Sequence, residues 1–254
     1  MRYRISIWKR EAREAMRGHT GLLIASSVLI SLLQFLAGTA AGYLFPGSDV
    51  LQRVLAEVFS FALTLVLGLF SAGMYLLFLN VARGKEASVR DLFYYVNHQP
   101  DRIIVASFVL AFLAWLTALP ASIYSYAHMN QVVDSQEMMQ IYGTFFLLYL
   151  LGLCLNLVFT IPLTLVYYRL ADDEVLSGIQ ALSQSVSWMK GHYGEFILLQ
   201  LSFIPWVLVG VLTFYLAFLW VIPYMEMSSI EFYLSLYNAN LLAEAEEDET
   251  PAEI

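Results

Sequence analysis

Charge is scarce in this chain, and five long stretches have none. Asp, Glu, Lys and Arg make up 13% of the 254 residues, about half of their share in soluble domains. The stretches without a charged residue cover residues 21–45, 58–82, 103–127, 141–168 and 196–224. Each exceeds the roughly 20 apolar residues that a helix needs to cross a bilayer. Because hydrocarbon offers the backbone no hydrogen-bonding partner, the sequence predicts an all-α polytopic membrane bundle with five clear transmembrane helices.

Cysteine and the common catalytic motifs are also missing or nearly so. Cys154 is the single cysteine, so the chain can form no internal disulfide and no thiolate metal site. The sequence has no phosphate-binding loop, no dinucleotide fingerprint and no nucleophile elbow. We therefore expect no enzyme activity, no cofactor and no metal. The alternative is a membrane enzyme that uses His19, His98 and His192, if their loops converge.

Cations are absent from the last 14 residues and gather in alternate loops. The N-terminal arm and the second and fourth loops hold 12 of the 13 Lys and Arg residues. Because Lys- and Arg-rich short loops stay in the cytoplasm, the N-terminus is predicted to be cytoplasmic. The acidic run 244–254 is predicted to be a disordered tail, which leaves 1–243 as a single integral membrane domain. The basic arm abuts a span, so we expect no nucleic-acid partner.

The segment 228–242 is amphipathic but short. Ser228 and Glu231 have the spacing of a helix capping box, and apolar residues follow on one stripe. An interfacial or bundle-packed helix is the favoured interpretation. A short sixth crossing stays open, and it would return to the cytoplasm a C-terminus that five crossings place outside.

A six-residue pattern, Met-basic-Gly-His-x-Gly, occurs at 16–21 and at 189–194, and an apolar stretch follows each copy. Amphipathic segments precede both copies, which predicts an internal repeat of cytoplasmic in-plane helix, glycine corner and span, before spans one and five. A looser third unit precedes span three at 87–96. In the first helix, Trp8 and its cationic neighbours suit the headgroup zone. The candidate corner residues, which are either architectural or bind a lipid headgroup, are Arg17, Gly18, His19, Lys190, Gly191 and His192.

Polar groups within the predicted spans are few and uncharged. Asn156 lies near the middle of span four and is predicted to hydrogen-bond a neighbouring helix, with a substrate contact as the alternative. The absence of ionisable residues argues against a proton-coupled pump. Prolines are predicted to interrupt spans three, four and five and to close span five; they are Pro120, Pro162, Pro205 and Pro223.

Several motifs along the chain are similar to those of one protein family. They are the basic arm 9–18, Val81-Ala82-Arg83-Gly84 with Asp91-Leu92-Phe93, Ser187-Trp188-Met189-Lys190-Gly191-His192, the stretch 201–206, Pro223-Tyr224 and Phe232-Tyr233. In these residues the chain resembles the domain of unknown function 975, over nearly its whole length. Leu163 and Pro205 stand where glycine is expected from that family. The resemblance implies a multi-pass protein of the bacterial plasma membrane, and it implies no activity or catalytic residue.

The absence of catalytic motifs, the amphipathic helices and the charged ends favour a non-enzymatic accessory, scaffold or lipid-interacting protein. Its expected partners are membrane lipids and a membrane protein, and the oligomeric state is left open. The alternative is a transporter or permeation component for a small solute or lipid, which the prolines within the spans and Asn156 would favour.

Overall fold

The computed structural model describes residues 2–47, 49–128 and 134–249, and all regular secondary structure in these ranges is helical. The long helices are α2 (Thr20–Leu44), α3 (Val50–Ala82), α5 (Pro100–His128), α6 (Ser135–Thr160) and α11 (Phe218–Glu249). The shorter ones are α1 (Arg2–Met16), η1 (Val89–Phe93), α4 (Tyr94–Asn97), η2 (Ile161–Leu163), α7 (Val166–Asp172), α8 (Gly178–Met189), α9 (Tyr193–Leu201) and α10 (Ile204–Leu212). The predicted all-α class is thereby confirmed.

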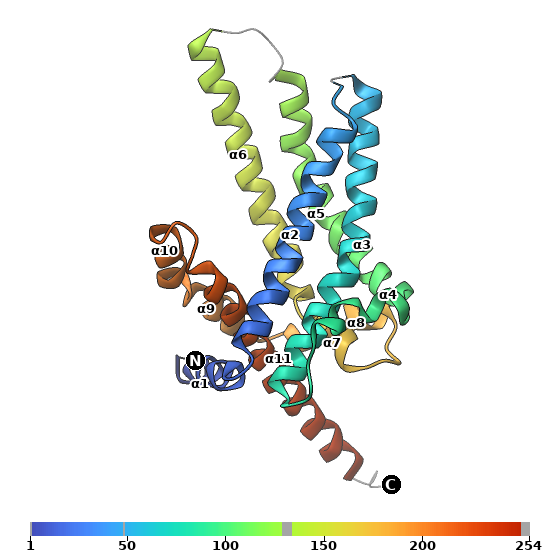
Figure 1. Cartoon of the computed structure of the whole chain (residues 1–254), viewed down its shortest axis with the longest axis vertical. Helices are drawn as coiled ribbons and strands as arrows, with labels where there is room; N and C mark the ends of the chain where they lie inside the picture. The colour runs from blue at the N-terminus through green and yellow to red at the C-terminus, as the bar shows by residue number, and fades with distance from the viewer. Residues whose placement is uncertain (1, 48, 129–133, 250–254) are drawn as a thin grey trace.

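Four long helices, α2, α3, α5 and α6, run up and down along the long axis of the molecule (Figure 1). Both termini lie at one end, which we call the termini end; the last residues of α2 and α5 and the first residues of α3 and α6 lie at the opposite, far end. Among the described residues, five helical segments are long and apolar enough to cross a membrane, which confirms the five predicted spans. They are Thr20–Leu44, Val50–Ala82, Pro100–His128, Ser135–Asp172 and Tyr193–Leu212.

Side-chain caps fix where several helices begin. The Asp49 carboxylate accepts from the backbone N–H of Gln52 at the start of α3, and that of Asp134 accepts from two N–H groups at the start of α6. Ser177 and Gln180 form a reciprocal capping box that starts α8. These caps satisfy donors that a helix leaves unpaired at its N-terminus.

The fifth span ends earlier than the sequence predicts. The prediction was one stretch, 196–224, but α10 ends at Leu212 and the chain reverses before α11 begins at Phe218. Phe214 and Tyr215 both have positive φ, 50° and 69°. Neither is glycine, so composition gave no signal for this turn. The hairpin of α10 and α11 turns back well short of the far end (Figure 1).

The structure confirms two of the four predicted proline effects. Pro162 lies in η2, which separates α6 from α7, and Pro205 lies in the first turn of α10, just after the break that follows α9. These two interruptions are confirmed. Pro223 lies inside α11 and does not close span five, so that prediction was wrong. Pro120 lies within α5, which continues as helix on both sides of it, so the predicted interruption of span three was also wrong.

Helix α11 absorbs the segment 228–242. The Ser228 hydroxyl donates to the Tyr224 carbonyl within the helix, so Ser228 is not a helix start and the predicted capping box was wrong. The segment is instead the middle of one 32-residue helix that runs back to the termini end (Figure 1). Of the predicted acidic tail, the backbone up to Glu249 belongs to α11, and residues 250–254 lie outside the described residues.

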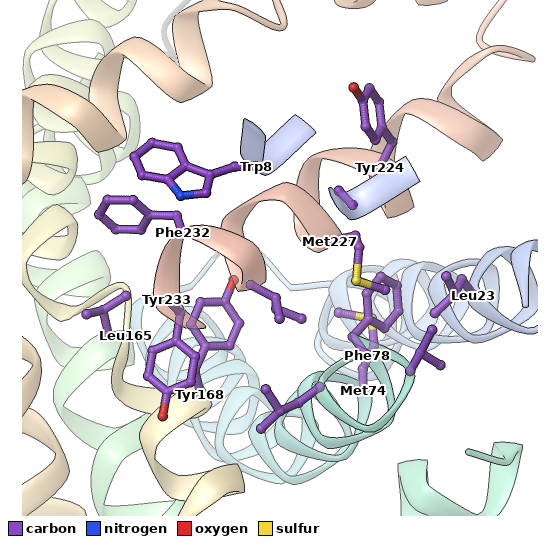
Figure 2. Close-up of a cluster of buried hydrophobic side chains, with 14 of the residues drawn as sticks. Trp8, Leu23, Met74, Phe78, Leu165, Tyr168, Tyr224, Met227, Phe232 and Tyr233 are labelled. Atoms are coloured by element: carbon purple, nitrogen blue, oxygen red, sulfur yellow. The ribbon is translucent and has the colours of Figure 1, made fainter. Parts of the chain in front are cut away.

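The largest hydrophobic core lies near the termini end and includes α1. Ile5, Trp8, Ala12 and Met16 are buried against other helices, and the Trp8 ring packs edge-on against Phe232 of α11 at 5.1 Å between centroids (Figure 2). The predicted placement of Trp8 among headgroups is therefore wrong. Trp8 is only 3% exposed because α11 covers the apolar face of α1. The sequence did not predict α11 as one continuous helix.

The spans bury little toward the far end. The buried residues of α3 begin only at Gly68. In α5 the buried residues beyond Ser107 are Thr117 and Ala121, and in α6 Gly152 is the single buried residue. The spans are thus held together near the termini end and meet few protein partners in their other half.

Both predicted glycine corners have the same backbone conformation. Gly18 has φ 86° and Gly191 has φ 83°, and each connects an amphipathic helix to a span. In both copies the histidine N–H donates to the methionine carbonyl three residues earlier, at 3.1 Å and 3.0 Å. This geometry requires a left-handed residue, which glycine adopts without strain. The internal repeat itself stays a prediction.

Replacing either corner glycine by alanine should destabilise the fold by about 1–2 kcal/mol, because a Cβ is strained at positive φ. The matched controls are Gly21→Ala and Gly194→Ala, three residues further on, where the backbone is helical and an added Cβ meets nothing within 4 Å. Alanine should be neutral or stabilising by up to about 1 kcal/mol at these two positions. Thermal unfolding in detergent measures both effects, and equal shifts in corner and control variants would contradict the architectural role.

Candidate functional site

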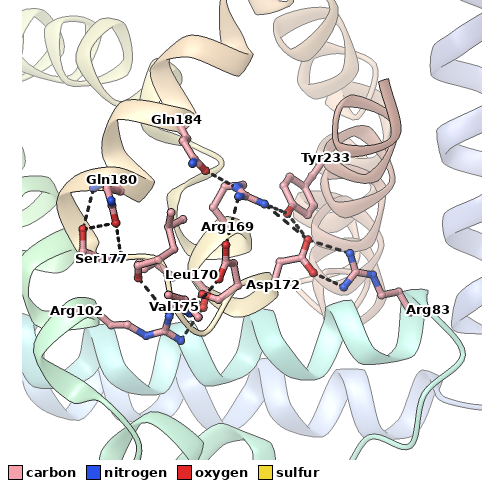
Figure 3. A network of polar contacts seen from close by, with 12 residues as sticks. Arg83, Arg102, Arg169, Leu170, Asp172, Val175, Ser177, Gln180, Gln184 and Tyr233 are labelled. Carbon is pink, nitrogen blue, oxygen red and sulfur yellow. Dashed lines mark hydrogen bonds and ion pairs between the residues drawn. The ribbon is translucent and has the colours of Figure 1, made fainter. Parts of the chain in front are cut away.

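A buried carboxylate, Asp172 at the end of α7, gathers groups from two other parts of the chain (Figure 3). The Arg83 guanidinium, just after α3, binds both of its oxygens, with Nη2 2.9 Å from Oδ2. The Tyr233 hydroxyl of α11 donates to Oδ2 at 2.6 Å. The Asp172 side chain is 4% exposed. A buried carboxylate needs such compensation, because its charge is otherwise costly in a low-dielectric interior.

Arg169, one turn before Asp172, extends this network to α8. Its Nη1 lies 4.0 Å from Asp172 Oδ2, and its Nε donates to Gln184 Oε1 at 2.9 Å. The guanidinium also lies 4.4 Å from the centre of the Trp188 ring. Burial, and then the bond to Asp172, raise the pKa of the Tyr233 phenol, so this group stays a donor. We call Arg83, Arg169, Asp172 and Tyr233 the Asp172 network.

Arg102, at the start of α5, closes the end of α7 from the other side. It is 6% exposed and donates to the carbonyl oxygens of Leu170, Asp173 and Leu176 at 3.0, 2.6 and 3.3 Å (Figure 3). A cation suits a helix C-terminus, where carbonyl groups point outward without partners. The two arginine sites together fix the segment between α7 and α8.

The chemistry of this network is structural. Its members are an acceptor, two permanent cations and a phenol held as a donor, and each side chain bonds or pairs with another member. Among the described residues, no group of three or more His, Cys, Asp and Glu is placed to hold a metal ion. The alternative histidine site is accordingly not assembled: His98 stacks on Tyr94, and His192 bonds Glu195 at 3.0 Å.

The candidate corner residues separate into exposed and occupied groups. Arg17, Gly18, His19, Lys190 and Gly191 are exposed, whereas His192 is half-buried. His192 Nδ1 faces the same Glu195 carboxylate that accepts from Arg4 of α1 at 2.9 Å. The second corner is therefore tied to α1 by a buried carboxylate, while the first presents its cation outward.

Asn156 connects two spans. Its Nδ2 lies 3.3 Å from Thr117 Oγ1 of α5, which agrees with the predicted hydrogen bond to a neighbouring helix. One turn earlier, Gly152 lets the helices approach so closely that a Cβ there would lie 2.4 Å from the Thr117 carbonyl oxygen. Small residues and polar side chains are the usual means by which membrane helices associate.

The structure also shows a polar cavity that the sequence did not indicate. A hollow of about 360 Å³ lies between α2 and α3, within the spans. Its polar lining residues are Gln34, Ser60, Thr64, Ser71, Tyr75 and Tyr167. They come from three helices, and their spacing along the chain has no recognisable motif. Because all are uncharged, the cavity can offer hydrogen bonds but no ion pair.

Near the cavity, a carboxylate that lies outside the predicted spans reaches the bundle interior. Glu226 of α11 is half-buried and its Oε2 lies 3.4 Å from the Tyr168 hydroxyl. The Tyr168 ring packs edge-on against Tyr75, which lines the cavity. Sequence analysis missed Glu226 because it follows the stretch 196–224 and the reversal at 213–217 was not foreseen.

The chain is a multi-pass helical membrane protein: it has five helical segments long and apolar enough to cross a membrane. The Asp172 network joins α3 to α7 at one end. More particularly, a family model described as "Protein of unknown function (DUF975)" matches residues 1–240, and the chain belongs to this family. The resemblance found in the motifs is thereby confirmed. No curated protein and no solved structure matches the chain.

Replacing Asp172 by Asn should lower the free energy of unfolding by about 3 kcal/mol, because two arginines then lose their buried counter-charge. The control is Glu14→Gln, which removes an exposed partner of Arg10 at 3.9 Å and should cost at most about 0.5 kcal/mol. Thermal unfolding of both variants tests the expectation. Equal stability of Asp172→Asn and the unmodified protein would show that the network does not hold the fold.

Stability should also depend on pH through Glu231, which faces α1. Burial, helped by the nearby charge of Glu11, raises the pKa of Glu231 from its ordinary value of 4.5 to about 7. The folded chain thus holds a proton that the unfolded chain releases, so stability falls as pH rises from about 4.5 to about 7. Glu231→Gln should flatten this part of the profile and stabilise the protein at pH 8. Glu86→Gln, at an exposed loop position, should leave the slope in place; an unchanged slope in Glu231→Gln would contradict the assignment.

Proposed function

We propose that this protein is a non-enzymatic accessory membrane protein that associates laterally with lipids and with a partner protein. The observation that supports this best is the low burial of the spans toward the far end. A helix that meets few helices of its own chain has the rest of its surface available to lipid chains or to another protein.

Helix α6 is the clearest case. It pairs with α5 through Gly152 and Asn156, and its other faces are exposed and apolar. Phe146, Leu147 and Val158 are 62%, 66% and 65% exposed. We propose this surface of α6 as the contact with the partner protein.

We further propose that the termini end faces the cytoplasm of a bacterial cell and that the membrane is the plasma membrane. The loops with 12 of the 13 cations are all at the termini end (Figure 1), which is the distribution expected for cytoplasmic loops. The exposed face of α1, with Arg10 and Arg13, and the exposed Arg17 just after it add an attraction to anionic headgroups.

A transporter or permeation component is the second candidate, and the polar cavity between α2 and α3 is the observation that favours it. Its hydroxyl and amide groups could receive a small neutral solute. The cavity would then need a path to both sides, and Tyr75 and Tyr167 would form its floor toward the termini end.

A photo-reactive phenylalanine analogue at Phe146 tests the lateral contact. The matched control is Phe35 on α2, which is 66% exposed against 62% for Phe146. In native membranes we expect one discrete protein adduct at Phe146 and lipid adducts alone at Phe35. Native mass spectrometry after gentle extraction should show the same added mass.

The two candidates give opposite results in this design. Identical adducts at both positions would contradict a specific partner surface on α6. Saturable solute uptake by proteoliposomes, lost in Ser71→Trp, would favour the transporter instead, because that substitution fills the polar cavity.

A further inference from the structure

A second and larger hollow lies between α3 and α5, toward the far end. It has a volume of about 740 Å³ and an almost wholly apolar lining, which we call the far groove. The side chains that form its walls include Val54, Val58, Phe61, Phe108, Phe112 and Trp115. The Phe61 and Phe108 rings meet edge-on at 5.6 Å between centroids, near its inner end.

The far groove is long enough for one acyl chain. On α5 its apolar lining runs from Phe108 to Ile123, which at 1.5 Å per residue is about 22 Å. Half of the hydrocarbon core is about 15 Å thick. A groove of this length and lining matches one acyl chain that enters from the far end.

Two opposite charges lie at the outer end of this groove. Arg53 and Glu57 are one helical turn apart on α3, so their side chains leave the same face of the helix. In the described part of the chain neither has an ion pair within 4.0 Å. Both are turned toward Tyr126 of α5 instead. The guanidinium lies 4.8 Å from the centre of its ring, and Glu57 Oε1 accepts from its hydroxyl at 2.8 Å.

Tyr126 therefore contacts a cation and an anion that lie one helical turn apart and form no ion pair within 4.0 Å. Within the described ranges no hydrogen bond occupies the guanidinium N–H donors, which can bind a phosphate in a bidentate manner. The carboxylate keeps acceptor positions for an ammonium group. A headgroup that carries a phosphate and, a few ångströms away, a primary ammonium is complementary to this pair.

We propose that the far groove binds a phospholipid with an ethanolamine-type headgroup, with one acyl chain between α3 and α5, its phosphate at Arg53 and its ammonium at Glu57. A choline headgroup fits less well, since its quaternary ammonium cannot donate to Glu57 and the Tyr126 ring already lies beneath the guanidinium. A headgroup without an amine leaves the Glu57 carboxylate without a cationic partner. The proposal gives the lipid association proposed above a defined site and rests on it.

The test uses native mass spectrometry of the full chain, delipidated in detergent and titrated with phosphatidylethanolamine, phosphatidylcholine and phosphatidylglycerol of identical acyl chains. We expect phosphatidylethanolamine to bind most tightly. Arg53→Ala should weaken it about tenfold, and Glu57→Gln should remove the preference over phosphatidylglycerol. Val58→Trp, at a position that is 62% exposed, should fill the groove and abolish binding. Arg90→Ala, which removes an exposed loop cation near the termini end, is the control and should bind as the unmodified protein does.

Phosphatidylglycerol binding as tightly as phosphatidylethanolamine, or Val58→Trp binding both lipids unchanged, would overturn the proposal. The same Val58→Trp protein carrying the photo-reactive group at Phe146 separates the two hypotheses. Retained partner adducts together with lost lipid binding support both. Retained adducts with unchanged lipid binding would contradict the lipid site in the groove and leave the partner surface supported. An absence of specific adducts in the protein without Val58→Trp would contradict the partner surface and leave the lipid site untouched.

Discussion

The carboxylate of Asp172 is the interaction on which the arrangement of the helices depends. It joins α7 to Arg83 at the end of α3 and to Tyr233 of α11, and through Arg169 it reaches α8. Asp172, Arg169 and Tyr233 are buried and Arg83 is half-buried, so solvent screens these ionic contacts only in part. Without the Asp172 carboxylate, the guanidinium groups of Arg83 and Arg169 would repel each other where α3 and α7 converge. At the termini end, the amphipathic helices therefore pack against other helices of the chain.

The helices pack closely at the termini end and much less toward the far end. The spans diverge from the Asp172 network and bury few side chains beyond Gly68 on α3 and Ser107 on α5. Two hollows of different character result. The one between α2 and α3 is polar and lies beside Tyr75 and Tyr167, whereas the far groove is apolar and ends at a charged pair. This division is the structural basis of the lateral association proposed above, since the far end is where the spans bury least.

Local physical rules predicted a large part of this molecule. Charge-free length was enough for five spans, because the cost of a charge in hydrocarbon does not depend on neighbours. The two corners followed from Gly18 and Gly191, since a left-handed turn has few alternatives to glycine. Asn156 was expected to bond a neighbouring helix because a polar side chain within a span needs a partner, and its amide lies 3.3 Å from Thr117 Oγ1. In each case the requirement is set by residues close together in the chain or by the bilayer.

The sequence by itself thus determined the class of protein, its spans and its corners. The tertiary structure decided the reversal at Phe214 and Tyr215, the burial of Trp8 under α11, and both hollows. It also decided the Asp172 network, in which Arg83 and Asp172 are 89 residues apart. Such contacts join side chains that have no fixed spacing, and a salt bridge or a groove wall places no periodic pattern on either partner. Their positions depend on how the helices cross, which is an outcome of packing the whole bundle.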